Sequence, residues 1–340
     1  MKAQVFYGPG DLRFEDAPMP EPGPGEVVLR IEAALTCGTD VKTLRRGHPV
    51  MIPRVPTVFG HEFAGTIAAV GSGVGGVRPG DRAVAANSAP CGTCPACRRG
   101  QANLCDDLLF VNGAYAEYIA LPPRLVARNL VTVTPAAQAA RVAFAEPVAC
   151  CLRAIDAAAV GAGETVAILG HGPLGLLLGL LARAGGAHVI LAGKTGLRLD
   201  RARGLGFTAC VDVTHVPDPV SAVREAAGGD VRCVIEATGR PEVWEQAMAV
   251  AGKGATVVFF GGCAPGTSVR LDTRRVHYEE LRLLGAFHHT PGLIRRAVAL
   301  LADGTLDPTP LVTHEMGLGD VPRALELMSR GEALKVLIRP

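Results

Sequence analysis

Apolar and polar residues alternate along the first part of the chain, as they do in β-strands that bury one face. The alternation is clearest in residues 27–31, 63–70 and 82–86, and Pro-Gly turns separate the early runs. Residues 113–120 continue the pattern, and their tyrosines are expected to serve packing alone. This part of the chain is therefore predicted to be mainly β.

From about residue 144 the pattern changes to Ala-rich helical stretches separated by short apolar runs. Helices are expected at residues 147–160, 176–184, 219–227 and 241–251, and buried strands at residues 165–169, 188–192, 210–212, 232–236 and 255–260. Strands that alternate with helices in this way are typical of βαβ units. The second part is thus predicted to be a doubly wound parallel sheet, and the chain to be of the α/β class.

The first of these strands is joined to its helix by a glycine motif, Gly170-His171-Gly172-Pro173-Leu174-Gly175. Such a motif is a weak signal alone, but between a strand and a helix it is typical of dinucleotide-binding folds. The glycines allow the backbone to approach a pyrophosphate, whose charge the helix N-terminus favours. The alternative is a turn that only packs the helix on the strand. His171 replaces the usual small residue, and we expect its side chain to face solvent.

The end of the second strand bears on which nicotinamide cofactor binds. NAD-binding folds place an Asp or Glu there to hold the ribose hydroxyls. This chain has Gly193, Lys194 and Thr195, with Arg198 shortly after them. The missing carboxylate and the added cations favour a ribose 2′-phosphate, so NADP is the preferred cofactor and NAD remains possible. Thr238 follows another strand at its carboxyl end and is a further cofactor candidate.

Several residues offer the chemistry of a metal site. His61 and Glu62 stand side by side before an apolar run, Cys37 lies upstream, and Glu146 lies far downstream. Thiolate, imidazole and carboxylate together suit a four-coordinate zinc. The spacing is too long for a local zinc finger, so a folded scaffold must bring the ligands together. A site with few permanent ligands keeps a position open for water or substrate.

Four further cysteines are closely spaced, at Cys91, Cys94, Cys97 and Cys105. A loop rich in Gly and Pro can direct their thiolates to one point. Four thiolates complete a tetrahedral shell, so this lobe, about residues 88–108, is expected to hold a structural zinc. The alternatives are a redox or disulfide cluster and a nucleic-acid-binding zinc knuckle. The other five cysteines are expected to be small buried apolar residues.

Together these motifs resemble the zinc-dependent medium-chain dehydrogenases over nearly the whole chain. The family pattern of Gly-His-Glu, two residues, Gly, five residues, Gly, two residues and a small apolar residue is met from Gly60 to Val74. The set Cys37, His61, Glu62 and Glu146 resembles the polyol (sorbitol) and threonine dehydrogenase branch. The resemblance implies a GroES-like, mainly-β catalytic domain of residues 1–147 and 288–340 around a Rossmann dinucleotide-binding domain of residues 148–287.

The resemblance also implies two zinc ions per chain, one catalytic and one structural. It assigns to Thr39 the relay of the alcohol proton, and it places Lys42 where many relatives have a histidine that passes this proton to solvent. Whether Glu62 and Glu146 bind the catalytic zinc directly stays open. A homodimer or homotetramer is the expected assembly.

Length, composition and charge indicate the number of domains and argue against binding to nucleic acid or membrane. The chain has 340 residues, of which 49% are hydrophobic and 19% charged, and a formal net charge of +2. This length favours two domains, and the balanced charge offers no basic face for nucleic acid. No apolar stretch is long enough to span a membrane, and the N-terminus lacks a signal-type apolar core, so a cytoplasmic location is expected.

The predicted function is the reversible transfer of hydride between a secondary alcohol and NAD(P), giving the ketone. A small-molecule alcohol of the polyol or sugar-derived kind is the expected substrate. The alternatives are a threonine-type amino-alcohol dehydrogenase and a catalytically silent NAD(P)-binding sensor of the same fold. A complete set of metal ligands favours the enzyme over the sensor.

Overall fold

The chain leaves its first compact unit near residue 149 and returns to it near residue 289. The computed structural model describes all 340 residues; the first unit contains Met1–Ala149 and His289–Pro340, and the second contains Cys150–His288. Helix α5 (Ala145–Ala158) carries the chain from one unit into the other. These limits differ by one or two residues from the boundaries that the family resemblance implies.

The first unit is built on mainly antiparallel β-sheets. Its largest sheet has the order β10-β6-β5-β3-β18-β17, with β9 also paired to β3; a second sheet has the order β2-β1-β4, and β7 pairs with β8. The strands are β1 (Lys2–Gly8), β2 (Asp11–Asp16), β3 (Val27–Leu35), β4 (Thr57–Val58), β5 (Glu62–Val70), β6 (Arg82–Ala85), β7 (Ser88–Ala89), β8 (Leu109–Phe110), β9 (Tyr118–Leu121), β10 (Leu130–Thr132), β17 (Val312–Gly317) and β18 (Lys335–Arg339). The helices are α1 (Gly38–Arg46), α2 (Pro95–Arg98), α3 (Pro123–Asn129), α4 (Ala139–Val142), α11 (Pro291–Ala302) and α12 (Val321–Arg330), and three short 3-10 turns are η1 (Ala102–Leu104), η2 (Thr309–Leu311) and η3 (Leu318–Asp320).

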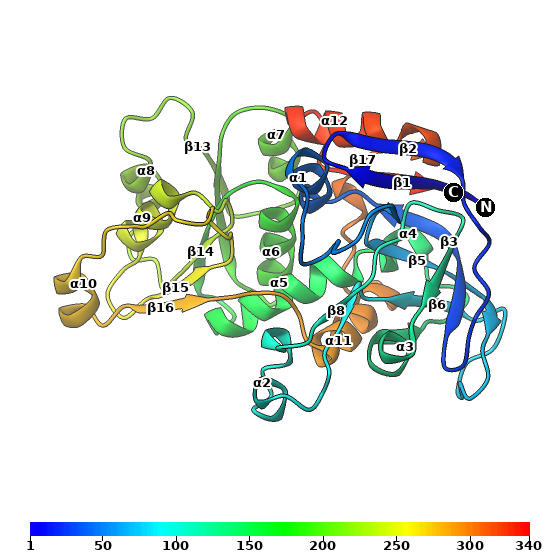
Figure 1. Cartoon of the computed structure of the whole chain (residues 1–340). Helices are drawn as coiled ribbons and strands as arrows, with labels where there is room; N and C mark the ends of the chain where they lie inside the picture. The colour runs from blue at the N-terminus through cyan, green and yellow to red at the C-terminus, as the bar shows by residue number, and fades with distance from the viewer. The chain divides into compact units, whose positions relative to one another are not determined.

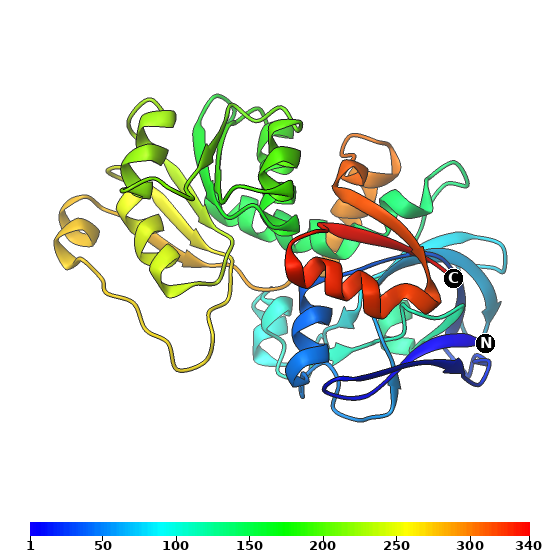
Figure 2. The ribbon, with the colours of Figure 1, turned by 90° about the horizontal axis from the view of Figure 1, so that it is seen from above.

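The last strand of the chain completes the sheet that the early strands begin. Strand β18 pairs antiparallel with β3, where Leu337 faces Leu35, and parallel with β17. Figure 1 shows both chain ends in this unit, and Figure 2 shows α12 lying along the two C-terminal strands. Strand β18 begins at Lys335, and its second residue, Val336, donates a hydrogen bond from N to Thr36 Oγ1, 300 positions earlier in the chain. The start of β18 thus lies next to the segment that follows β3.

Close packing of β3 against β5 explains one glycine of the family pattern. A Cβ on Gly65 would lie 2.0 Å from the carbonyl oxygen of Arg30 on the neighbouring strand, so no other residue fits there without moving the backbone. The inward faces of these strands bury Leu29, Phe63 and Ile67 in the core. Packing in the core thus fixes the register of β5 against β3, and with it the position of Glu62 at the start of β5.

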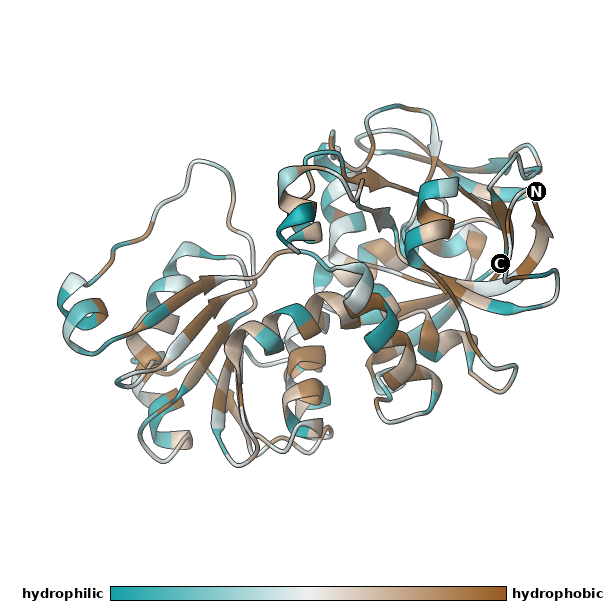
Figure 3. Ribbon diagram, turned by 90° about the horizontal axis from the view of Figure 1, so that it is seen from below, coloured by the Kyte–Doolittle hydropathy of each residue, from teal (hydrophilic) through white to brown (hydrophobic).

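The second unit is a six-stranded parallel sheet of order β13-β12-β11-β14-β15-β16. Its strands are β11 (Thr165–Leu169), β12 (His188–Gly193), β13 (Ala209–Asp212), β14 (Cys233–Glu236), β15 (Thr256–Phe259) and β16 (Arg282–Gly285), and its helices are α6 (Pro173–Ala184), α7 (Leu197–Arg203), α8 (Pro219–Ala226), α9 (Pro241–Val250) and α10 (Thr273–Tyr278). The strands are apolar along most of their length (Figure 3), as expected where helices cover both faces of a parallel sheet. The prediction of a doubly wound sheet is confirmed.

Most predicted elements lie within one to three residues of their observed ends, but some predictions were wrong. Residues 113–117 do not belong to a strand, because β9 begins only at Tyr118. The sequence analysis did not identify α7, α10 or the edge strand β16, whose short and partly exposed segments carry weak periodicity. None of the helices combines the length and apolar character that crossing a bilayer requires.

Candidate active site

The start of α1 positions the thiol of Cys37. Cys37 is the N-cap of this helix, and its sulfur accepts a hydrogen bond from Thr39 N at 3.5 Å. Asp40 reaches back to accept from Cys37 N at 3.0 Å, which completes a reciprocal capping box. The cap therefore fixes the position of the Cys37 sulfur at the start of α1.

His61 and Glu62 are brought to the same point by the start of β5. Both side chains are buried, and the ligand atoms of Cys37, His61 and Glu62 lie within 4.8 Å of one another. The preceding Gly60 has a φ of +88° and lies against the ring of Tyr115, which a Cβ there would approach to 2.7 Å. Only glycine fits this turn, so the first residue of the Gly-His-Glu motif is explained by backbone conformation and by space.

Asp40 also orients the imidazole of His61. Its Oδ1 lies 2.9 Å from His61 Nδ1, and its Oδ2 accepts a hydrogen bond from the Tyr115 hydroxyl at 2.5 Å. This arrangement leaves Nε2 as the metal-binding nitrogen, in the carboxylate–histidine pattern common at zinc sites. Burial lowers the pKa of His61, but the charges of Asp40 and Cys37 outweigh burial, and the pKa lies well above its usual value. The expectation that Tyr115 serves packing alone was wrong, since its hydroxyl is engaged.

Lys335 is a member of this site that the sequence analysis missed. Its Nζ lies 2.6 Å from Glu62 Oε1 and also contacts Oε2, and both side chains are almost fully buried. Burial lowers the pKa of Lys335, but Glu62, together with the charges of Cys37 and Glu146, outweighs burial and raises this pKa above its usual value. The pair lies 273 residues apart in the chain, and a lysine at the start of a C-terminal strand carries no local signal of such a role.

The other predicted residues of the site take different positions. Glu146 lies in the first turn of α5, outside the group formed by Cys37, His61 and Glu62. Burial raises the pKa of Glu62, and the charge of Glu146 adds a smaller effect in the same direction. Thr39 is half-buried beside the Cys37 sulfur, whereas Lys42 is exposed on α1. The donor set of thiolate, imidazole and carboxylate fits zinc.

The four cysteines of the lobe form a second, separate cluster. All four sulfurs lie within 4.8 Å of one another, with Cys91 Sγ 4.0 Å from Cys97 Sγ and Cys94 Sγ 3.9 Å from Cys105 Sγ. A tetrahedral shell with Zn–S bonds of about 2.3 Å separates its sulfurs by about 3.8 Å, whereas a disulfide requires about 2.05 Å. Hydrogen bonds from the backbone N–H and hydroxyl of Thr93 and from Cys94 N lower the pKa of Cys91 to about 6. The cluster fits a structural zinc, and no disulfide is present.

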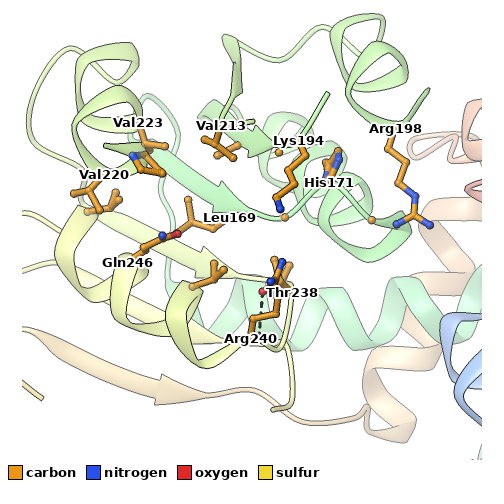
Figure 4. Close-up of a pocket in the computed structure, with 18 residues that line it drawn as sticks. Leu169, His171, Lys194, Arg198, Val213, Val220, Val223, Thr238, Arg240 and Gln246 are labelled. Atoms are coloured by element: carbon orange, nitrogen blue, oxygen red, sulfur yellow. Dashed lines mark hydrogen bonds between the residues drawn. The ribbon is translucent and has the colours of Figure 1, made fainter. Parts of the chain in front are cut away.

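In the second unit, a pocket of about 310 Å³ lies at the carboxyl ends of the parallel strands (Figure 4). Six predicted cofactor residues line it: Gly170, Gly172, Gly193, Lys194, Arg198 and Thr238. Valines from the segment just after β13 and from helices α8 and α9 make the rest of the wall largely apolar. Such a pocket, apolar with a cationic rim, suits a nucleotide at the switch point of a doubly wound sheet.

The remaining predicted cofactor residues support the glycine loop or lie beside the pocket. Pro173 and Leu174 open α6, and a Cβ on Gly175 would lie 2.0 Å from the carbonyl oxygen of Gly170, so this glycine permits close packing of helix and strand. Thr195 N donates to Thr214 Oγ1 at 2.7 Å and lies outside the pocket lining. Arg240, which the sequence analysis missed, lines the pocket after Thr238.

The expectation of a solvent-facing His171 was wrong. The side chain is partly buried in the pocket wall, and its ring lies against Gly193, where a Cβ would come within 2.3 Å of the His171 Cγ. Burial and the charge of Arg198 lower the pKa of His171. Its position depends on the packing of two segments that are distant in sequence, which the glycine motif alone does not reveal.

Comparisons with known proteins agree with this geometry. Residues 23–131 match the family model of the alcohol dehydrogenase GroES-like domain, and residues 173–303 match that of the zinc-binding dehydrogenases. The chain is 32% identical to the L-threonine 3-dehydrogenase of Idiomarina loihiensis, with 99% of each chain covered, and 31% identical to the sorbitol dehydrogenase of Ovis aries, with 98% of this chain and 95% of the relative covered. A solved zinc-binding dehydrogenase from Sinorhizobium meliloti, bound to NADP, is 33% identical, with a TM-score of 0.92 over 100% of this chain and 99% of the other.

The chain therefore belongs to the zinc-dependent medium-chain dehydrogenases, and it is an alcohol dehydrogenase of their polyol and threonine branch. The predicted combination of a GroES-like and a Rossmann domain is confirmed.

Proposed function

We propose that this protein oxidises a secondary alcohol of the polyol or sugar-derived kind to the ketone, with NADP as the hydride acceptor. The observation that carries the proposal is the convergence of the Cys37, His61 and Glu62 ligand atoms within 4.8 Å, beside the hydroxyl-bearing Thr39. When bound, zinc supplies Lewis acidity that makes an alcohol more acidic, and the nicotinamide accepts hydride from its carbon.

Each residue of the catalytic site has a proposed part. Cys37 and His61 hold the metal, and Glu62 and Glu146 complete its surroundings as ligands or through water. Asp40 contacts His61 Nδ1, the ring nitrogen that faces away from the metal, and so fixes the orientation and tautomer of the ring. Thr39 relays the alcohol proton: its hydroxyl accepts a hydrogen bond from the alcohol and passes its own proton on to water, on the side of the exposed Lys42.

Support for NADP comes from the second unit. Gly193 ends β12 without a carboxylate, and the cations Lys194, Arg198 and Arg240 line the same pocket. A negatively charged 2′-phosphate gains from such cations, whereas the ribose hydroxyls of NAD lack their usual acidic partner. The relative from Sinorhizobium meliloti was solved with NADP bound, which supports the same preference.

The similar proteins support two substrate classes for this chain, polyols and amino alcohols. Sorbitol dehydrogenases are among them, which favours a polyol, and L-threonine 3-dehydrogenases support an amino alcohol as the second candidate. The four-cysteine lobe adds a structural zinc to the catalytic one, so we propose two zinc ions per chain.

The proposed assembly is a homodimer or homotetramer formed through the edge of the parallel sheet. Strand β16 pairs only with β15, so one side of its backbone is open. Large apolar side chains near this edge are exposed: Leu284 at 39%, Phe287 at 61% and Tyr278 at 75%. An open edge strand with exposed apolar side chains favours pairing with a second copy.

The test is the initial rate of nicotinamide reduction by the zinc-loaded protein on a panel of polyols, sugars and L-threonine, with NADP and NAD in parallel. We expect reduction of NADP by a polyol, and loss of this rate in Cys37→Ala. The matched control is Cys263→Ser, a half-buried cysteine outside both clusters. A rate with L-threonine alone would select the second candidate, and a rate that survives Cys37→Ala would contradict the proposed metal site.

A further inference from the structure

We propose that His171 is a specificity-determining residue for the cofactor: its ring occupies the space that an acidic side chain at position 193 needs, and its imidazole faces the ribose 2′-phosphate together with Lys194. The inference rests on the proposed use of NADP. It assigns a function to a residue of the glycine motif that the dinucleotide fold itself does not specify.

The contact between His171 and Gly193 is the geometric basis. A Cβ on Gly193 would lie 2.3 Å from Cγ, 2.7 Å from Cδ2 and 2.8 Å from Cβ of His171. Rotation about χ1 moves the ring atoms of His171 but leaves its Cβ in place, so rotation alone does not make room. Gly193 does not have a positive φ, so space, and not backbone conformation, requires the glycine.

This contact has a consequence for the choice of cofactor. Position 193 ends β12, where NAD-binding folds place the acid that holds the ribose hydroxyls. With His171 present, an Asp at position 193 has no room for its side chain. His171 thus excludes the carboxylate that would repel a 2′-phosphate. The ring nitrogens of His171 lie at the same edge of the pocket and can donate a hydrogen bond to this phosphate.

Charges around His171 agree with a phosphate site. Lys194 follows Gly193 and lies beside His171 (Figure 4), Arg198 on α7 lowers the pKa of His171, and Arg240 lines the same pocket from the loop before α9. The one acid whose charge reaches His171 is Asp212 on β13, and Asp212 already accepts hydrogen bonds from Thr214. Arg240 is paired with Glu242 at 2.8 Å, so Lys194 and Arg198 give the rim its positive charge where the 2′-phosphate would lie.

The arrangement also predicts proton uptake when NADPH binds. Without ligand, burial and Arg198 keep the pKa of His171 below its usual value, so the ring is neutral at pH 8. A phosphate that carries nearly two negative charges opposes both effects and raises this pKa. The affinity for NADPH should therefore rise as the pH falls from 8 to 6, more in the native protein than in His171→Gln. The titration of the phosphate itself is common to both proteins and cancels in the comparison.

The experiment measures dissociation constants of NADPH and NADH by calorimetry for four zinc-loaded proteins: the native chain, His171→Ala, Gly193→Asp, and the double variant His171→Gly with Gly193→Asp. Glycine is used at position 171 in the double variant because alanine would keep the Cβ that lies 2.8 Å from a Cβ at position 193. His188→Ala, at the exposed start of β12, is the matched control. Loss of one charge-assisted hydrogen bond should weaken NADPH binding about tenfold in His171→Ala and change NADH binding less than about twofold. Gly193→Asp should bind both cofactors poorly, and the double variant should bind NADH at least about tenfold more tightly than Gly193→Asp, because the space is then free.

Two results would overturn the inference. Equal weakening of NADPH and NADH in His171→Ala would mean that the residue only shapes the loop. A Gly193→Asp protein that binds NADH as tightly as the double variant would mean that His171 does not exclude an acid at position 193.

A native protein that binds NADH more tightly than NADPH would instead contradict the proposed cofactor, and the comparison of Gly193→Asp with the double variant would still test the steric claim. Should Gly193→Asp fail to fold, recovery of folding in the double variant supports the contact, and its absence counts against it.

Discussion

Lys335 Nζ lies 2.6 Å from one carboxylate oxygen of Glu62 and contacts the other, and the two side chains are 1% and 0% exposed. The Glu62 carboxylate thus contacts the ammonium group of Lys335 and also lies within 4.8 Å of the ligand atoms of Cys37 and His61. Charges buried this deeply remain in a core only when they are paired, because removal from water costs several kcal/mol per ion. The ion pair therefore fixes the strand β18 to the metal site as well as balancing its charge.

Replacement of Lys335 by Met should leave the Glu62 carboxylate buried without its partner. We expect a loss of about 3–5 kcal/mol in the free energy of unfolding, measured by urea denaturation in the presence of chelator. The double variant Lys335→Met with Glu62→Gln should recover a large part of this loss, because no charge is then unpaired. Lys253→Met, at an exposed turn, is the control. A loss below about 1 kcal/mol in Lys335→Met would contradict a paired buried charge.

The hydroxyl of Tyr115 should matter to metal binding although it lies behind the metal site. Tyr115→Phe keeps the ring that covers Gly60 and removes the hydrogen bonds of the hydroxyl, the short one to Asp40 and a longer one to the carbonyl oxygen of Leu35. Because Asp40 then holds the His61 ring less firmly, zinc affinity should fall about tenfold, and Asp40→Asn should lower it about 10- to 100-fold. Chelator competition measures both.

Tyr118→Phe, on the neighbouring strand β9, serves as the control for this series and should leave zinc affinity unchanged. If Tyr115→Phe also binds zinc as tightly as the native protein, the hydroxyl has no part in orienting the ligand.

The four-cysteine lobe should lose its own zinc without loss of the catalytic one. Cys97→Ser should reduce the metal content from two zinc ions per chain to one, because serine does not replace a thiolate in this shell. Hydrogen exchange should rise across residues 88–108, since the ion is expected to stabilise a lobe with little core of its own. Retention of two zinc ions, or unchanged exchange in this lobe, would refute a structural zinc.

The edge of the parallel sheet provides a test of assembly. Leu284→Glu places a charge on β16, whose open side we propose to pair with a second copy. Sedimentation should show a smaller particle than the native protein at the same concentration, with zinc content unchanged. A native protein that sediments as a monomer, or a variant that keeps the native size, would rule out this interface.

Local patterns were enough to predict the elements that carry chemistry. The strand, glycine turn and helix around Gly170 follow from periodicity and from the backbone needs of glycine, and the closely spaced cysteines follow from ligand spacing. Contacts between distant segments were not predictable in this way. Lys335 acquires its role only because β18 returns beside β3, and His171 only because its loop packs on the end of β12.

The family resemblance supplied what periodicity does not, namely the return of the C-terminal segment to the first unit. Short exposed elements such as β16 were not predicted, because in a strand of four residues with three exposed positions a single partly buried residue, Leu283, sets no pattern.

The most direct test of the proposed chemistry is the transfer of a labelled hydride. A polyol that carries deuterium on its carbinol carbons is incubated with the zinc-loaded protein and NADP, and the mass of the reduced cofactor is measured. We predict NADPH that is one mass unit heavier, formed together with a ketone, and no labelled cofactor from Cys37→Ala. Unlabelled NADPH, or label transfer that persists in Cys37→Ala, would contradict hydride transfer at the Cys37, His61 and Glu62 site.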